Sequence, residues 1–414
     1  MNLVKNYITS IGISLCMLGV SLGNFIRVLT GINLVIPFMI ISILCIVNYG
    51  NLARFRFPNI SKDILLLLLS QIIIVIYMFI GDSQEMNVSK DMFVYYSVIL
   101  IFAIGTLPKE YLQKFIVVFY ILSSVNVILA LYLFFNGFEG ITTGNVDKEY
   151  LTSLEETGKA MIFLYPTAGV THTMATLALL KDKILRIKLL NILVLLFLFV
   201  DFTLIISSGK RTVVLFFILY IIYYLWNERK FSSFINFLKF VPVIIILLII
   251  IQYALPHVPF IADFVNDFAE RLQKGIDTLF GIDKSNYDES AAQRVEIRRK
   301  VSLVFDKEFG LFNYLFGKGY MVMYMDQPLL QCFFDMGLVG VFVYIYNALF
   351  VSIKHLLCKT NDSVYFMFKL SCINIVLTCL TAGAPYGYQM YLPVLLMLYA
   401  YHNQKITYYD AELF

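Results

Sequence analysis

The sequence predicts an all-α polytopic membrane protein with about 12 transmembrane helices and one large extracytoplasmic loop that contains amphipathic helices. Composition is the first reason. Of the 414 residues, 60% are hydrophobic and 14% are charged, with a mean hydropathy of +0.79, whereas soluble domains are about half apolar and a quarter charged. The second reason is that long apolar runs recur along the chain, and residues 255–327 form the longest polar segment between them.

Each expected span is an apolar run, and a helix needs about 20 such residues to cross the hydrocarbon core. The runs lie at 8–25, 30–48, 63–81, 90–107, 111–136, 164–181, 188–208, 211–227, 237–255, 328–351, 364–382 and 386–402. They divide the chain into a bundle at 1–254 with about nine spans, the loop at 255–327, and three spans with a tail at 328–414. The first span is expected to remain as an uncleaved anchor, because no convincing small-residue cleavage site follows it.

Lysine and arginine in alternate loops predict the orientation, because cytoplasmic loops are enriched in both. The richer set holds Lys5, Arg54, Arg56, Lys62, Lys109, Lys114, Lys181, Lys183, Arg186, Lys188, Arg229, Lys230, Lys239, Lys354, Lys359, Lys369 and Lys405. The other set, apart from the long loop, holds Arg27, Lys90, Lys148, Lys159, Lys210 and Arg211. We therefore expect both termini in the cytoplasm and residues 255–327 on the outer side.

The long loop is predicted to contain two helices, one over 260–280 and one that begins near Ser290. The second has a stripe of apolar residues at helical spacing, namely Ile297, Val301, Val304 and Phe305. Arg294 falls inside this stripe and Arg298 at its edge, so both are expected to be directed toward the membrane body. A guanidinium there needs an anion. This is either an acidic ligand or a carboxylate of the loop itself, such as Glu289 or Asp306.

Four segments occur in a fixed order and carry a family resemblance. They are Ser207-Ser208-Gly209-Lys210-Arg211-Thr212, Ala292-Gln293-Arg294-Val295-Glu296-Ile297, Leu315-Phe316-Gly317-Lys318-Gly319, and Asp326-Gln327-Pro328-Leu329-Leu330-Gln331 followed by Gly337-Leu338-Val339-Gly340. In this order they resemble the O-antigen polymerase and ligase superfamily of membrane glycan-transfer enzymes. The matching features are its serine/arginine turn, its loop arginine, its glycine-x-glycine turn and the segment that leads into the next span.

The resemblance implies a GT-C-like fold in the bacterial cytoplasmic (inner) membrane and the activity of a surface polysaccharide polymerase. Such an enzyme transfers glycan from undecaprenyl pyrophosphate to a sugar hydroxyl of another lipid-linked repeat unit. Arg294 and Arg211, supported by Lys210 and Arg298, would neutralise the departing pyrophosphate, because arginine binds oxyanions in a bidentate manner. No cofactor and no metal ion are expected, since no carboxylate pair of the DxD kind stands out.

One departure from the family concerns Asp326-Gln327, where ligases typically carry a histidine-asparagine pair. A neutral imidazole suits a general base, so its absence favours the polymerase. Asp326 could serve as that base, or it could pack or cap at the start of the following span. Gln327 beside it is a candidate substrate-binding residue.

Further candidates lie in or near the spans. His172 either contacts the acceptor or is a hydrogen-bonded histidine between helices. Tyr320 either stacks on a sugar or packs in the protein. Asp201 and Asp335 are functional candidates because they are intramembrane acids, although each could simply pair with a hydroxyl or with a base on another helix.

Two alternatives to the polymerase stay open: a ligase that moves finished glycan to another acceptor, and a lipid-linked sugar flippase or transporter. A transporter would place charges and broken helices at the midplane and usually shows repeats. The expected partners are undecaprenyl-pyrophosphate-linked repeat units and membrane lipids, with a chain-length regulator as a further candidate and no nucleic acid.

Overall fold

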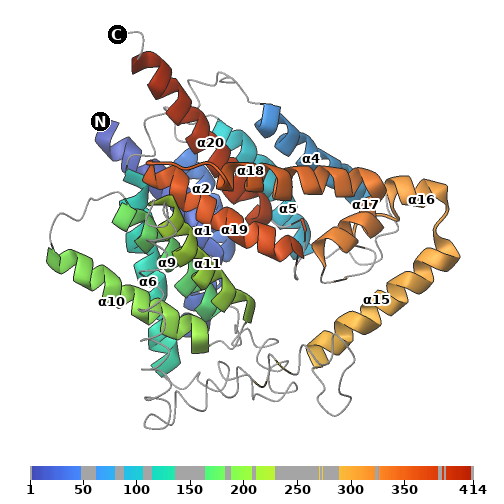
Figure 1. The fold of residues 1–414 in the computed structure, drawn as a ribbon, viewed down its shortest axis with the longest axis horizontal. Helices are drawn as coiled ribbons and strands as arrows, with labels where there is room; N and C mark the ends of the chain where they lie inside the picture. The colour runs from blue at the N-terminus through green and yellow to red at the C-terminus, as the bar shows by residue number, and fades with distance from the viewer. Residues whose placement is uncertain are drawn as a thin grey trace, which may run out of the picture. The chain divides into compact units, whose positions relative to one another are not determined.

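The computed structural model describes residues 2–47, 62–79, 88–105, 114–135, 164–181, 188–207, 211–228, 270, 273, 289–321, 325, 327–380, 385–386 and 388–411. Within these ranges the regular secondary structure is helical without strands (Figure 1), which confirms the all-α prediction. Contacts divide the chain into two compact units, Met1–Ser208 with Leu311–Phe414, and Gly209–Gly310.

The first unit contains most of the described helices. They are α1 (Asn2–Thr30), α2 (Val35–Ile46), α4 (Lys62–Phe79), α5 (Val88–Gly105), α6 (Phe115–Phe135), α9 (Leu164–Lys181), α10 (Lys188–Ser207), α16 (Leu311–Phe316), α17 (Pro328–Tyr344), the π-helix η3 (Ile345–Val351), α18 (Ser352–Leu356), α19 (Ser363–Leu380) and α20 (Tyr388–Ala411). The second unit contains α11 (Arg211–Asn227) and α15 (Glu289–Glu308).

Each predicted span except 237–255 coincides with a helix, and 237–255 lies outside the described residues together with nearly all of the loop helix expected at 260–280. Among the described helices, four are long and apolar enough to cross a membrane: Asn6–Thr30, Lys62–Phe79, Phe115–Leu133 and Pro328–Leu356. The other apolar helices are shorter. The 12 residues of α2, for example, extend about 18 Å, less than the hydrocarbon core. The protein is thus a membrane protein by its apolar helices, while the number of spans stays a prediction.

The exposed faces of these helices are apolar. On α2, Ile36, Ile40 and Leu44 are 46%, 53% and 65% exposed, whereas Val35 and Met39 on the other side are buried. Soluble proteins rarely expose such a stripe of large apolar side chains to water. Hydrocarbon would cover it at no cost, so this face fits a lipid-facing surface.

A core of small and apolar side chains joins α1, α6, α9 and α10, formed by Phe25, Val127, Ala130, Leu133, Ala168 and Leu204. Gly169 brings α9 and α10 close together, because a Cβ atom at this position would lie 3.0 Å from the carbonyl oxygen of Asp201 and 2.9 Å from Ile205. Small residues allow such close approach in membrane bundles. The approach places the following turn of α9 directly beside Asp201.

Helix α17 is broken at Gly337, whose φ of 63° and ψ of −155° are not helical. In Figure 1 two arms of α17 meet beside α16. The first arm carries the buried residues Gln331 and Asp335, and the second continues through η3 and α18. Irregular backbone at membrane depth requires internal partners, and the turn after α16 supplies them.

Candidate functional site

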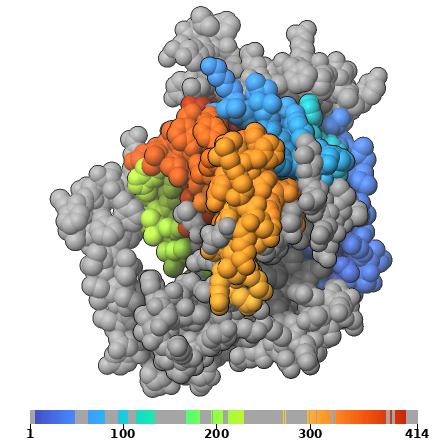
Figure 2. Space-filling view, turned by 90° about the vertical axis from the view of Figure 1, so that its right-hand side faces the viewer, coloured from blue at the N-terminus to red at the C-terminus, as the bar shows by residue number. Residues whose placement is uncertain are grey.

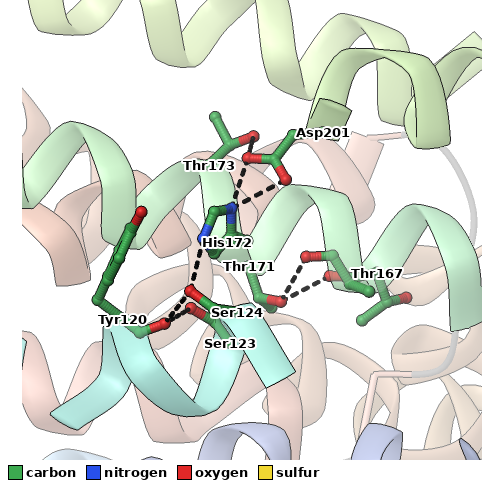
Figure 3. Close-up of polar contacts among 9 residues, drawn as sticks. Tyr120, Ser123, Ser124, Thr167, Thr171, His172, Thr173 and Asp201 are labelled. Carbon is green, nitrogen blue, oxygen red and sulfur yellow. Dashed lines mark hydrogen bonds and ion pairs between the residues drawn. The ribbon is translucent and has the colours of Figure 1, made fainter. Parts of the chain in front are cut away.

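One buried polar centre in the described part of the first unit is built around His172 on α9. His172 and Asp201, on α10, are both 0% exposed. Nδ1 of His172 lies 2.9 Å from each carboxylate oxygen of Asp201 (Figure 3). Thr173 also donates a hydrogen bond of 3.2 Å to Oδ2 of Asp201. The acid is therefore held by an imidazole and a hydroxyl, as suits a carboxylate among apolar helices.

The second nitrogen of His172 points to α6. Nε2 lies 3.1 Å from the hydroxyl oxygen of Ser124, which also lies 2.8 Å from the backbone carbonyl oxygen of Tyr120. Figure 3 shows Ser124, His172 and Asp201 in a line across α6, α9 and α10. This is the arrangement of a hydroxyl, a base and an orienting acid.

The position of the Ser124 proton depends on the charge of His172. Asp201 favours a proton on Nδ1, so in the neutral imidazole Nε2 accepts a hydrogen bond from Ser124. If Nε2 gains a proton, it donates to Ser124, and the serine hydroxyl can turn and donate to the carbonyl of Tyr120. Both arrangements leave Ser124 and the two ring nitrogens of His172 hydrogen-bonded.

Aromatic rings enclose this centre. The ring of Tyr120 lies 5.0 Å from the imidazole of His172, and the ring of Phe197 lies 5.4 Å away in an edge-on arrangement. Because His172 and Asp201 are both 0% exposed, the local dielectric constant is low, which strengthens their polar contact. His172 and Asp201 thus form a hydrogen-bonded pair between α9 and α10.

A second polar centre surrounds Asp335 on the first arm of α17. Nε2 of Gln331 lies 2.9 Å from both oxygens of Asp335, Tyr386 donates its hydroxyl to Oδ2 at 2.8 Å, and the backbone N–H of Met321 donates to the same oxygen at 3.1 Å. Asp335 is 0% exposed. Its pairing with a hydroxyl, expected as one alternative, is confirmed.

The glycine-x-glycine turn is fixed to α17 through its backbone. The N–H groups of Lys318 and Gly319 donate to the carbonyls of Phe334 and Asp335, both at 2.9 Å. The adjacent Tyr320 is only 6% exposed, and its ring lies 5.0 Å from that of Tyr386. Tyr320 therefore packs inside the protein rather than presenting its ring for stacking on a sugar.

Helix α15 forms where the sequence predicted the second loop helix. Val301 is 2% exposed, while Glu296, Arg299 and Lys300 are exposed, so the apolar stripe is the buried side. Lys300 forms a 2.8 Å ion pair with Glu296 and lowers the pKa of that carboxyl. The exposed cations of the run are therefore separated from the apolar side.

The other predicted site residues are placed only in part. Positions 294 and 298 stand seven and three residues before Val301 on α15, which is the helical spacing of one face, and Arg211 is the first residue of α11. The side chains of Arg294, Arg298 and Arg211 lie outside the description, as do Lys210 and Asp326. Gln327 precedes α17 as its N-cap residue and makes no side-chain cap hydrogen bond.

Among the residues of these centres, Ser124, Gln331 and Tyr386 were not predicted from the sequence as hydrogen-bond partners. Gln331 stands one helical turn before Asp335, so its spacing could have indicated the contact. Ser124 and Tyr386 approach their partners only through the packing of separate helices, and no sequence signal marks them.

Comparison with known proteins finds no matching family model, no matching curated protein and no matching solved structure. Among the described residues, no three histidine, cysteine, aspartate or glutamate side chains gather in a group that could hold a metal ion.

Proposed function

We propose that this protein is a surface polysaccharide polymerase of the cytoplasmic membrane. It would transfer a growing glycan from undecaprenyl pyrophosphate to a sugar hydroxyl of another lipid-linked repeat unit. The observation that carries the proposal is that Nε2 of His172 meets a hydroxyl oxygen at 3.1 Å while Asp201 holds Nδ1. This is the geometry of a general base that acts on an alcohol.

The hydroxyl of Ser124 marks the place of the acceptor hydroxyl. The acceptor would displace Ser124 from Nε2, and the Ser124 hydroxyl would turn to donate to the carbonyl of Tyr120, which lies 2.8 Å away. As the acceptor oxygen forms the new bond to the anomeric carbon, its proton passes to Nε2 of His172. The bond between the anomeric carbon and pyrophosphate breaks, and Asp201 stabilises the imidazolium that forms.

The departing pyrophosphate needs permanent positive charge. By their spacing from Val301 along α15, Arg294 and Arg298 would share the face on which Val301 is buried, and Arg211 is proposed to join them. Guanidinium groups bind two oxygens of a diphosphate at once and stay ionised. In this proposal the base comes from α9, which removes the need for a histidine at position 326. The loop faces outward and both termini lie in the cytoplasm.

The test uses the purified protein in phosphatidylcholine vesicles with a synthetic undecaprenyl-pyrophosphate-linked repeat unit, and products are separated by chain length on a gel. His172→Gln should lower the rate by about 100-fold or more, and Arg294→Ala should abolish long products. Ser124→Ala should retain most activity, because the acceptor replaces this hydroxyl.

Three results would count against the proposal. Normal chain lengths in both His172→Gln and Arg294→Ala would remove the proposed site. Transfer to a different acceptor without elongation would identify a ligase, and movement of the lipid-linked sugar across the vesicle membrane without bond formation would identify a flippase or transporter.

A further inference from the structure

The short helix α16 presents an apolar surface that no described part of the protein covers. None of its residues is buried. Leu311 and Phe312 are 81% and 71% exposed, and Leu315 and Phe316 are each 41% exposed. The rings of Phe312 and Phe316 lie one turn apart with their centroids at 4.9 Å. Figure 2 shows the orange segment that includes α16 at the surface of this face.

This surface is held rigidly, because α16 is joined to α17 on both sides of the helix break. A Cβ atom on Gly337 would lie 2.4 Å from the backbone of Leu315, and one on Gly317 would lie 2.2 Å from the backbone of Asp335. Tyr314 adds a ring contact with Phe333 at 6.1 Å. The exposure of α16 is therefore a property of the folded structure and does not arise from a detached segment.

The apolar surface of α16 continues a lipid-facing stripe on the second arm of α17 and on η3. Leu338, Phe342 and Phe350 on this stripe are 54%, 73% and 55% exposed. The helix from the break at Gly337 to Leu356 rises about 30 Å, which is the thickness of the hydrocarbon core. Because Leu315 contacts the break itself, α16 stands at one end of that span.

We propose that α16 inserts its apolar side chains among the acyl chains of the bilayer, at the boundary between headgroups and hydrocarbon next to α17. The occupant of this surface is phospholipid. Aromatic and aliphatic side chains at such a boundary anchor a segment in the membrane interface. The insertion fixes the end of the long loop at the membrane surface. This inference does not depend on the reaction that the protein performs.

The chain is well suited to a fluorescence test because Trp226 is its single tryptophan. In the background Trp226→Phe, three variants each introduce one reporter: Phe312→Trp on α16, Phe342→Trp on the lipid-facing stripe, and Asn361→Trp on the exposed loop after α18. The full chain is placed in vesicles of phosphatidylcholine brominated either near the headgroup or near the middle of the acyl chain. Leu311→Trp serves as a second α16 reporter if Phe312→Trp does not fold.

Bromine near the headgroup should quench Phe312→Trp at least half as strongly as it quenches Phe342→Trp, and more strongly than bromine in mid-chain does. Asn361→Trp should respond to aqueous iodide instead. The inference is overturned if Phe312→Trp and Leu311→Trp respond to iodide like Asn361→Trp. It is also overturned if neither brominated lipid nor iodide quenches the α16 reporters, because a second protein chain would then cover this surface.

Discussion

Replacement of Gly337 by alanine tests whether close backbone packing holds the two arms of α17 and the glycine-x-glycine turn together. Gly337 has a φ of 63°, and an added Cβ atom would lie 2.4 Å from the carbonyl carbon of Leu315 and 2.5 Å from its oxygen. Both atoms belong to the backbone, so no side-chain rotation relieves the clash. The turn must move away from α17.

The expected loss follows from the contacts. A left-handed backbone costs an alanine about 1–2 kcal/mol. Separation of the turn breaks the hydrogen bonds from Lys318 to Phe334 and from Gly319 to Asp335, each worth about 0.5–1.5 kcal/mol. The sum is about 2–5 kcal/mol. This corresponds to an increase of about 30- to 5,000-fold in the population of the opened state.

Reactivity of Cys332 measures this opening, because its thiol is 0% exposed and lies three residues before Asp335. The exposed Cys358 and the half-buried Cys45 are first replaced by serine, and the labelling rate with an uncharged maleimide is recorded in detergent together with the thermal unfolding temperature. Gly31→Ala is the matched control. Gly31 also has a positive φ, 76°, but nothing lies within 4 Å of its Cβ position. It should lose about 1–2 kcal/mol and leave the labelling of Cys332 unchanged.

Equal unfolding temperatures and equal labelling rates for Gly337→Ala and Gly31→Ala would refute this reasoning. They would mean that the approach of the turn to α17 contributes nothing beyond backbone conformation.

Two further predictions concern charged groups. Asp335→Asn should destabilise the first unit by about 1–3 kcal/mol, because an amide cannot accept the hydrogen bonds of Gln331, Tyr386 and Met321 together. An unfolding temperature and a Cys332 labelling rate equal to those of the unchanged chain would contradict this prediction. Glu296→Gln should leave the unfolding temperature unchanged at neutral pH, since the pair with Lys300 is exposed. The pKa of Glu296 is lowered. Any contribution of this pair to the free energy of unfolding is therefore present above the usual pKa of a glutamate, and it is lost as the pH falls through the lowered value. A loss of stability on raising the pH would contradict this assignment.

The sequence by itself determined the elements. Apolar runs located most helices to within a few residues, as with 164–181 for α9 and 211–227 for α11, because a helix needs only its own backbone hydrogen bonds in an apolar solvent. The exceptions are α1, which extends further at both ends, and α20, which continues to Ala411. Helical spacing also separated Val301 from Arg299 and Lys300 on α15, since the faces of a helix follow from about 3.6 residues per turn. Similarly, the sequence identified His172, Asp201 and Asp335 as buried polar residues that require partners.

Only the tertiary structure decided which partners these residues have. Ser124 and His172 lie 48 positions apart and meet because α6 and α9 pack together, and Tyr386 reaches Asp335 across 51 positions. Packing also decided that α17 breaks at Gly337, where the backbone of Leu315 occupies the space that a side chain would fill. Contacts of this kind depend on which helix faces pack together, and the sequence of one helix does not determine which other helix packs against it.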